Sequence, residues 1–120
     1  MRLRLATPQD AAVLTEFNAA MALETEGKEL LPEVIGAGVR ALLANPASGF
    51  YVLAEEGGRA AGALMVTKEW SDWRNGNFWW IQSVYVRPDL RRRGVYGALG
   101  MRQTRYFVFE ELKPGVRFYR

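Results

Sequence analysis

The sequence predicts an α/β fold in which a mixed, mainly antiparallel sheet is flanked by helices. Three observations lead to this prediction: an alternating apolar pattern at the start of the chain, two amphipathic helical patterns after it, and then strand patterns joined by hairpin turns. The chain has 120 residues, of which 49% are hydrophobic, so we expect a single domain over residues 1–120.

A strand and two helices come first. Alternation over Arg2–Leu5 predicts the strand, and Thr7-Pro8-Gln9-Asp10 supplies an N-cap, a proline and an acidic capping-box partner that start a helix at Pro8. This helix ends at the Glu24–Gly27 segment. A second helix begins around Pro32 and stops at Asn45-Pro46.

The strand patterns that follow are joined by turns. Glu56-Gly57-Gly58-Arg59 predicts a hairpin turn, and Asn75-Gly76 predicts a second tight turn within a polar loop over residues 71–77. The predicted strands are Phe50–Glu55, Ala60–Trp70, Phe78–Val86 and Thr104–Glu110, with a further edge strand suggested over Val116–Tyr119.

Composition narrows the chemistry. The sequence has no cysteine and no histidine, which excludes disulfides, thiolate nucleophiles, Cys/His zinc sites and imidazole-based triads, and we expect no metal. Any acid–base catalysis would therefore have to use Asp, Glu, Tyr, Lys, an amine substrate or water. No apolar stretch has the length of a membrane span and the start lacks a signal-peptide h-region, so we expect a cytoplasmic protein without a membrane partner.

The charge is unevenly distributed along the chain. Residues 1–90 carry 8 basic and 11 acidic side chains, whereas residues 91–120 carry 8 and 2. The basic quarter indicates an anionic partner, which charge alone leaves open among nucleic acid, an acidic membrane surface and a phosphorylated small ligand. Within it, a strand ending at Val86 is followed by the basic loop Arg91–Gly94 and a helix start near Val95, an order suited to holding a phosphate group.

The segment from Gln82 to Tyr96 resembles motif A of the GCN5-related N-acetyltransferases (GNAT), whose loop is written Q/R-x-x-G-x-G/A. Arg91 matches its first position and Gly94 its first glycine, while Tyr96 replaces the final small residue and Gly97 follows. The resemblance implies that the backbone of Val84 and Val86 pairs with the pantetheine arm of acetyl-CoA, and that the N–H groups of residues 92–97 hold its pyrophosphate. The implied cofactor site comprises Val84, Tyr85, Val86, Arg91, Arg92, Arg93, Gly94, Val95, Tyr96 and Gly97.

The sequence departs from the family pattern in two places. Near residues 97–100 the usual late helix, strand and helix, roughly 35 to 45 residues by ordinary element lengths, have no counterpart, and neither does the tyrosine they carry. Three explanations are open: a natural or engineered compact variant, a deletion in the gene or its assembly, and a stretch of residues that has been left out of the sequence. In addition, Trp80 stands where some members carry a carboxylate, so deprotonation of the acceptor needs a water relay near Gln82, Ser83 and Tyr85 or a carboxylate from elsewhere. The candidates, also expected to bind the acceptor, are Glu24, Glu26 and Asp72.

Ordinary structural roles compete with these interpretations. Residues 91–93 alone would be a solvated basic turn, Glu24 and Glu26 are most often plain helix-end carboxylates, and Tyr85 and Tyr96 are more often packing residues than proton donors. We expect Trp79 or Trp80 in the core, and leave Trp70 and Trp73 open.

The resemblance implies transfer of an acetyl group from acetyl-CoA to a primary amine by direct attack, on a small-molecule or peptide acceptor. The alternative is a degenerate CoA-binding or interaction module without turnover. A nucleic-acid-binding protein ranks third, because the aromatic residues follow buried-strand patterns. A strand with a missing neighbour leaves an open sheet edge, so we also expect a homodimer.

Overall fold

The computed structural model describes residues 2–73, 75–91 and 118–119 of the chain. In chain order its elements are the strand β1 (Arg2–Leu5), the 3₁₀ turn η1 (Pro8–Asp10), the helices α1 (Ala11–Glu26) and α2 (Pro32–Leu43), the strands β2 (Gly49–Glu56), β3 (Arg59–Ser71) and β4 (Gly76–Val86), the 3₁₀ turn η2 (Pro88–Leu90) and the strand β5 (Phe118–Tyr119).

The start of the first helix is fixed by a network around Arg4. The guanidinium donates to both Asp10 oxygens at 2.8 Å and to Glu55 at 2.8 Å, while the Thr7 N–H donates to the Asp10 carboxylate at 2.7 Å. Asp10 therefore joins β1 to the helix start and fills the capping role predicted for it. The first turn after Thr7 is 3₁₀, and α-helical bonding begins at Ala11 rather than at Pro8.

Helix ends and turns fall where the sequence predicts them. Gly27 ends α1 in the left-handed conformation, with φ of 64°. Gly57 and Gly58 both have positive φ, 61° and 76°, which suits a tight hairpin turn between β2 and β3. Asn75, with φ of 48°, turns the chain between β3 and β4, and both strands run closer to this turn than the sequence suggested.

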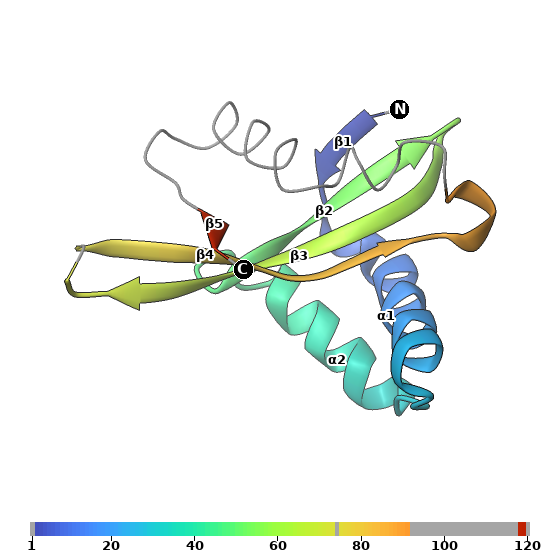
Figure 1. The fold of residues 1–120 in the computed structure, drawn as a ribbon, viewed down its shortest axis with the longest axis horizontal. Coiled ribbons are helices and arrows are strands. Elements are labelled where there is room, and N and C mark those ends of the chain that lie inside the picture. The colour runs from blue at the N-terminus through green and yellow to red at the C-terminus, as the bar shows by residue number, and fades with distance from the viewer. Residues whose placement is uncertain (1, 74, 92–117, 120) are drawn as a thin grey trace.

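The sheet has the order β1-β2-β3-β4-β5. The first four strands are antiparallel, and β5 runs parallel to β4, pairing Phe118 with Trp79 and Tyr119 with Trp80. The predicted mixed, mainly antiparallel sheet is therefore confirmed. Figure 1 shows both helices on the same face of this sheet.

Each face of the sheet carries its own apolar cluster. Leu14 and Phe17 of α1 and Val39 of α2 pack on the helix-covered face against residues that include Leu53 and Tyr85. The opposite face gathers a second cluster that includes Val52, Leu64, Val66, Trp79 and Val86. Trp79 is thus a core residue, as expected, whereas Trp70 and Trp73 are exposed on the β3–β4 hairpin.

A β-bulge at Gln82 determines which side chains of β4 face the helices. Met65 of β3 pairs with Ser83 and Val66 pairs with Ile81, so Gln82 is an extra residue in the ladder. Because side chains alternate along a strand, one extra residue reverses the alternation beyond it. Tyr85 consequently faces the helices.

The rest of the predicted architecture lies outside the described residues. This applies to the basic loop from residue 92 onward, to the helix start near Val95, to the strand predicted over Thr104–Glu110 and to the proposed deletion near residues 97–100. The edge strand suggested over Val116–Tyr119 is seen as the two residues of β5.

Candidate functional site

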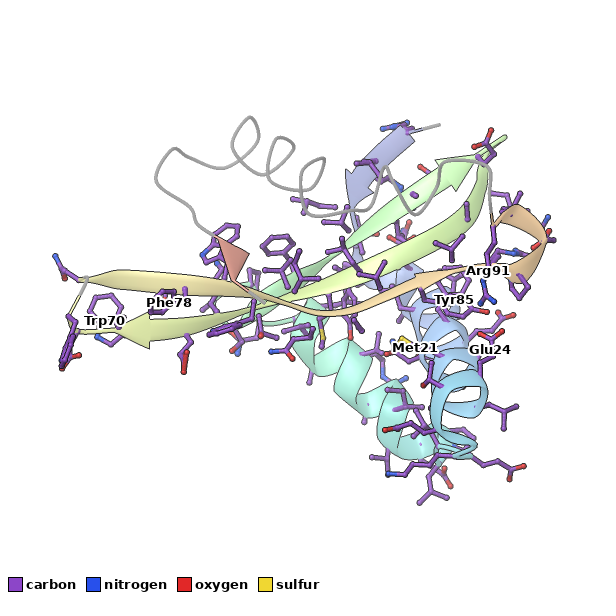
Figure 2. The ribbon with its side chains drawn as sticks, viewed as in Figure 1. Met21, Glu24, Trp70, Phe78, Tyr85 and Arg91 are labelled. Carbon is purple, nitrogen blue, oxygen red and sulfur yellow. The ribbon has the colours of Figure 1, made fainter. Side chains whose placement is uncertain are left out.

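A cleft of about 550 Å³ lies between the last turns of α1 and the end of β4. This volume is within the range of small-molecule sites. Figure 2 shows Met21 and Glu24 of α1 opposite Tyr85 and Arg91, at the end of the sheet away from Trp70 and Phe78. The cleft is lined by Met21, Glu24, Thr25, Val84, Tyr85, Val86 and Arg91.

The α1 side of the cleft follows from helix geometry. Met21, Glu24 and Thr25 are spaced by three and four residues, which places them on one face of a helix. Gly27 ends the helix shortly after them, so Glu24 lies in the last turn and remains partly exposed. The carboxylate therefore faces solvent across the mouth of the cleft.

The β4 side of the cleft contributes main-chain groups. The Arg87 N–H donates to the Ala61 carbonyl of β3 at 2.9 Å. Because N–H directions alternate along an antiparallel strand, Tyr85 also points its N–H towards β3, and Val84 and Val86 point theirs away from it. Among the described strands, β5 pairs with this outer edge at Trp79 and Trp80, and none pairs at Val84 or Val86.

Arg91 connects the two sides. After β4, the η2 turn buries Leu90 and brings Arg91 back over the strand end. Its Nε donates to the Val86 carbonyl at 3.0 Å, and its Nη2 donates to the two Glu24 oxygens at 3.1 and 2.9 Å. The guanidinium carbon also lies 5.6 Å from the centre of the Tyr85 ring. The bond to Glu24 raises the pKa of Arg91, so it stays charged.

Tyr85 forms the floor of the cleft. Its ring packs on Phe17 with centroids 5.1 Å apart, and the residue is 9% exposed. Burial, followed by the negative charge of Glu24, raises the pKa of Tyr85 above its usual value. The phenol is therefore protonated at neutral pH.

The structure brings together some of the residues proposed from the sequence and separates others. Glu24, Val84, Tyr85, Val86 and Arg91 share the cleft, and residues 92–97 lie outside the described residues. Glu26 is exposed at the end of α1 and is not part of the lining. Asp72 lies in the β3–β4 turn, ten residues of extended strand or about 33 Å from Val86, so it does not border this cleft.

Of the three groups named for a water relay, Ser83 and Tyr85 line the same small pocket, and Gln82 lies apart from them. The Gln82 amide donates to the Thr67 hydroxyl at 2.7 Å, away from the cleft lining. Ser83 lines a second pocket of about 10 Å³ beneath α1, which shares Met21 and Tyr85 with the cleft. Trp80, at the position of the family carboxylate, donates its indole N–H to Glu69 at 3.0 Å.

Sequence reasoning missed Met21 and Thr25. Met21 belongs to the apolar pattern of the helix and Thr25 to its expected end. Met21 lies three residues before Glu24 and four before Thr25, and this helical spacing was the available signal, which becomes useful only once the facing strand is known.

Comparison with known proteins establishes the family. The model of the acetyltransferase (GNAT) family matches residues 13–111 of the chain. The chain belongs to the GNAT family. A Clostridium difficile 630 protein described as a possible acetyltransferase has 39% sequence identity and a TM-score of 0.86, over 99% of this chain and 78% of that one.

Two further structures share the fold at lower identity. One is a predicted acetyltransferase with acetyl-CoA from Clostridium acetobutylicum, with a TM-score of 0.70 and 18% identity over 99% of this chain and 80% of that one. The other is an aminoglycoside acetyltransferase in complex with sisomicin from an uncultured soil metagenomic sample, with a TM-score of 0.72 and 14% identity over 99% of this chain and 76% of that one. No curated protein matches the sequence.

Two negative findings accompany these matches. Among the helices within the described ranges, none is long and apolar enough to cross a membrane. Residues 2–73, 75–91 and 118–119 also contain no group of three or more Asp or Glu side chains placed to hold a metal ion.

Proposed function

We propose that this GNAT-family protein transfers an acetyl group from acetyl-CoA to a primary amine. The observation that carries the proposal is the outer edge of β4, where Val84 and Val86 direct their N–H groups away from β3 beside a cleft of about 550 Å³. An extended chain with amide groups, such as pantetheine, can pair with this edge as an added strand does.

The residues divide into two sets around this edge. Val84 and Val86 would hold the pantetheine amides. The phosphates would be held by the segment from Arg91 to Gly97, which also contains Arg92, Arg93, Gly94, Val95 and Tyr96. Glu24, as the carboxylate of the cleft, would hold the amine. Tyr85 supports both sets by forming the floor between them.

Acetyl-CoA supplies an activated thioester to this site. The neutral amine nitrogen forms a bond to the carbonyl carbon, the C–S bond breaks, the amine loses a proton and the CoA thiolate gains one. A chain without cysteine suits this direct attack because no covalent acyl-enzyme is needed. The protein contributes position, a low-dielectric floor at Tyr85 and N–H groups near the thioester.

The competing function is a CoA-binding module without turnover. Its support is that Glu24, the carboxylate lining the cleft, is bonded to Arg91. The two functions differ in one measurement, because a binding module takes up CoA and releases no acetylated product.

The test combines binding and turnover. Calorimetry with acetyl-CoA should show binding, and thiol release with mass spectrometry of products should show an acetylated amine from a broad panel. Gly94→Pro should abolish binding because it removes an N–H donor and fixes the backbone, whereas Gly94→Ala keeps the donor and should retain more of the binding. Equal affinity of wild type and a folded Gly94→Pro variant would contradict the site.

The proposal also includes a homodimer in the cytoplasm. The support is the stretch of the outer edge of β4 over residues 81–83, which no described strand pairs and which precedes the part assigned to pantetheine. Such an edge is suited to pairing with a second copy.

A further inference from the structure

The guanidinium of Arg91 lies in the cleft as a bound cation would. It donates to the Glu24 carboxylate at 2.9 Å and to the Val86 carbonyl at 3.0 Å, and its carbon lies 5.6 Å from the centre of the Tyr85 ring. A carboxylate, an aromatic face and a carbonyl oxygen are the groups with which proteins recognise ammonium and guanidinium ions. These three groups therefore form a site for a cation between α1 and β4.

This cation site adjoins the outer edge of β4, where the pantetheine of acetyl-CoA is proposed to bind. One guanidinium bonds to the Val86 carbonyl through Nε and to Glu24 through Nη2, so the carboxylate lies within one guanidinium width of β4. An ammonium group held by Glu24 would then stand beside the strand edge assigned to pantetheine. From this position the acceptor would react once its ammonium group has lost a proton, because only the neutral nitrogen has a lone pair to attack the thioester.

The site has capacity for one cation. Glu24 is the only carboxylate among the described residues that line the cleft, and Arg91 engages both of its oxygens. A second cation beside Arg91 would meet like-charge repulsion without a second carboxylate to offset it. Arg91 and a cationic ligand therefore exclude each other.

We infer that Arg91 is an internal competitor for the acceptor site, and that a cationic amine binds at Glu24 only when Arg91 leaves it. The inference rests on the proposed function. It identifies the acceptor class as a primary amine whose ammonium or guanidinium group is recognised by Glu24, and it makes Arg91 a positioning residue that acts through Glu24.

The same residue links the two substrates. Arg91 is the first residue of the segment proposed to hold the CoA phosphates, and a phosphate group attracts a guanidinium as strongly as a carboxylate does. CoA would draw Arg91 away from Glu24 and so strengthen amine binding. Linkage requires the reverse effect to be equal, with the amine strengthening CoA binding by the same factor.

The test uses agmatine, whose guanidinium copies that of Arg91, as the probe and CoA rather than acetyl-CoA so that no turnover occurs. Calorimetry should show agmatine binding about fivefold or more tighter to Arg91→Ala than to wild type, because coupling between sites typically has this size or more. CoA should tighten agmatine binding to wild type and leave Arg91→Ala unchanged. Glu24→Gln in the Arg91→Ala background should abolish the gain.

Matched variants separate this effect from general changes in charge or folding. Arg87→Ala removes an equal charge four residues earlier, where the side chain pairs with Asp89 rather than Glu24, and should bind agmatine as wild type does. Arg91→Lys keeps the charge and should restore competition. Thermal unfolding of each variant checks that the fold is intact.

The outcomes distinguish the two proposals. CoA binding with equal or weaker agmatine affinity in Arg91→Ala overturns this inference alone, as does a lack of agmatine binding by every variant. A lack of CoA binding by wild type overturns the proposed function instead.

Discussion

Arg91 and Glu24 are 67 residues apart in the chain, and one guanidinium nitrogen of Arg91 contacts both carboxylate oxygens of Glu24. The pair spans the mouth of the cleft and joins α1 to the end of β4. Both side chains are partly exposed, 46% for Arg91 and 38% for Glu24. Exposed ion pairs contribute little to stability, so the pair is better explained by the cleft it occupies than by the folding of the domain.

A stability measurement tests this view of the pair. Glu24→Gln should leave the midpoint of thermal unfolding close to that of wild type, and close to that of Glu26→Gln, which removes a charge from the same helix end. The expected change is in ligand binding instead. If Glu24→Gln lowers the midpoint much more than Glu26→Gln does, the ion pair has a structural role in the folding of the domain.

The Arg4–Asp10 pair should behave differently because it is more enclosed and also caps a helix. Asp10 bonds to Arg4 at 2.8 Å and to the Thr7 N–H at 2.7 Å. Asp10→Asn should lower the free energy of unfolding by about 1–3 kcal/mol, because it removes one of the two charged partners of the partly buried Arg4 guanidinium. Glu29→Gln, at an exposed position in the α1–α2 loop, should change it by less than about 0.5 kcal/mol. Urea unfolding of the two variants makes the comparison.

The stability of the protein should also depend on pH through the Arg4–Asp10 pair. Hydrogen bonding from Arg4 holds the pKa of Asp10 below its usual value in the folded protein. A lowered pKa in the folded state stabilises the protein above the unfolded-state value of about 3.9, and this contribution is lost as the pH falls through the folded-state pKa. The difference in stability between wild type and Asp10→Asn should therefore shrink on acidification below about pH 4. A constant difference down to about pH 2 would contradict this assignment.

Glycine substitutions test the close approach of two strands. A Cβ at Gly49 would lie 2.2 Å from the Val66 carbonyl oxygen, which is main chain and cannot rotate away. Gly49→Ala should lower the free energy of unfolding by about 1–3 kcal/mol, as overpacking does. A Cβ at Gly38 in α2 would meet nothing within 4 Å, and Gly38→Ala should raise the free energy by about 0.5–1 kcal/mol. Chemical denaturation with equal effects of both substitutions would refute the β2–β3 packing described.

The proposed dimer is tested by the mass of the protein in solution. Light scattering at high protein concentration should give twice the mass of the chain, because a strand edge that no described strand pairs over residues 81–83 favours pairing with a second copy. A sharp monomer mass under these conditions would remove the dimer from the proposal and leave the cleft unaffected.

Local signals in the sequence predicted the elements well because the responsible interactions are local. The capping pattern at Thr7 and Asp10, the end of α1 at Gly27 and the turn at Asn75 each depend on residues a few positions apart. The family motif also pointed to Val84 and Val86, which line the cleft, and their binding of a ligand stays a prediction. These features required no knowledge of how the strands are aligned.

Long-range alignment could not be obtained in the same way. The bulge at Gln82 depends on how β4 pairs with β3, and no residue type in the sequence marks its position. The Arg91–Glu24 contact depends on where α1 lies over the sheet. Asp72 was placed near the acceptor because it belongs to a loop, whereas the length of the β3–β4 hairpin takes that loop to the far end of the strand.

Pairing of acetyl-CoA with the outer edge of β4 is central to the proposed function, and hydrogen exchange of backbone amides measures this pairing most directly. Tyr85 and Arg87 direct their N–H groups to β3 and should exchange slowly with or without ligand, which makes them internal controls. The amides of Val84 and Val86 should become slower in exchange when acetyl-CoA is added. Unchanged exchange at Val84 and Val86 under saturating acetyl-CoA would contradict the site.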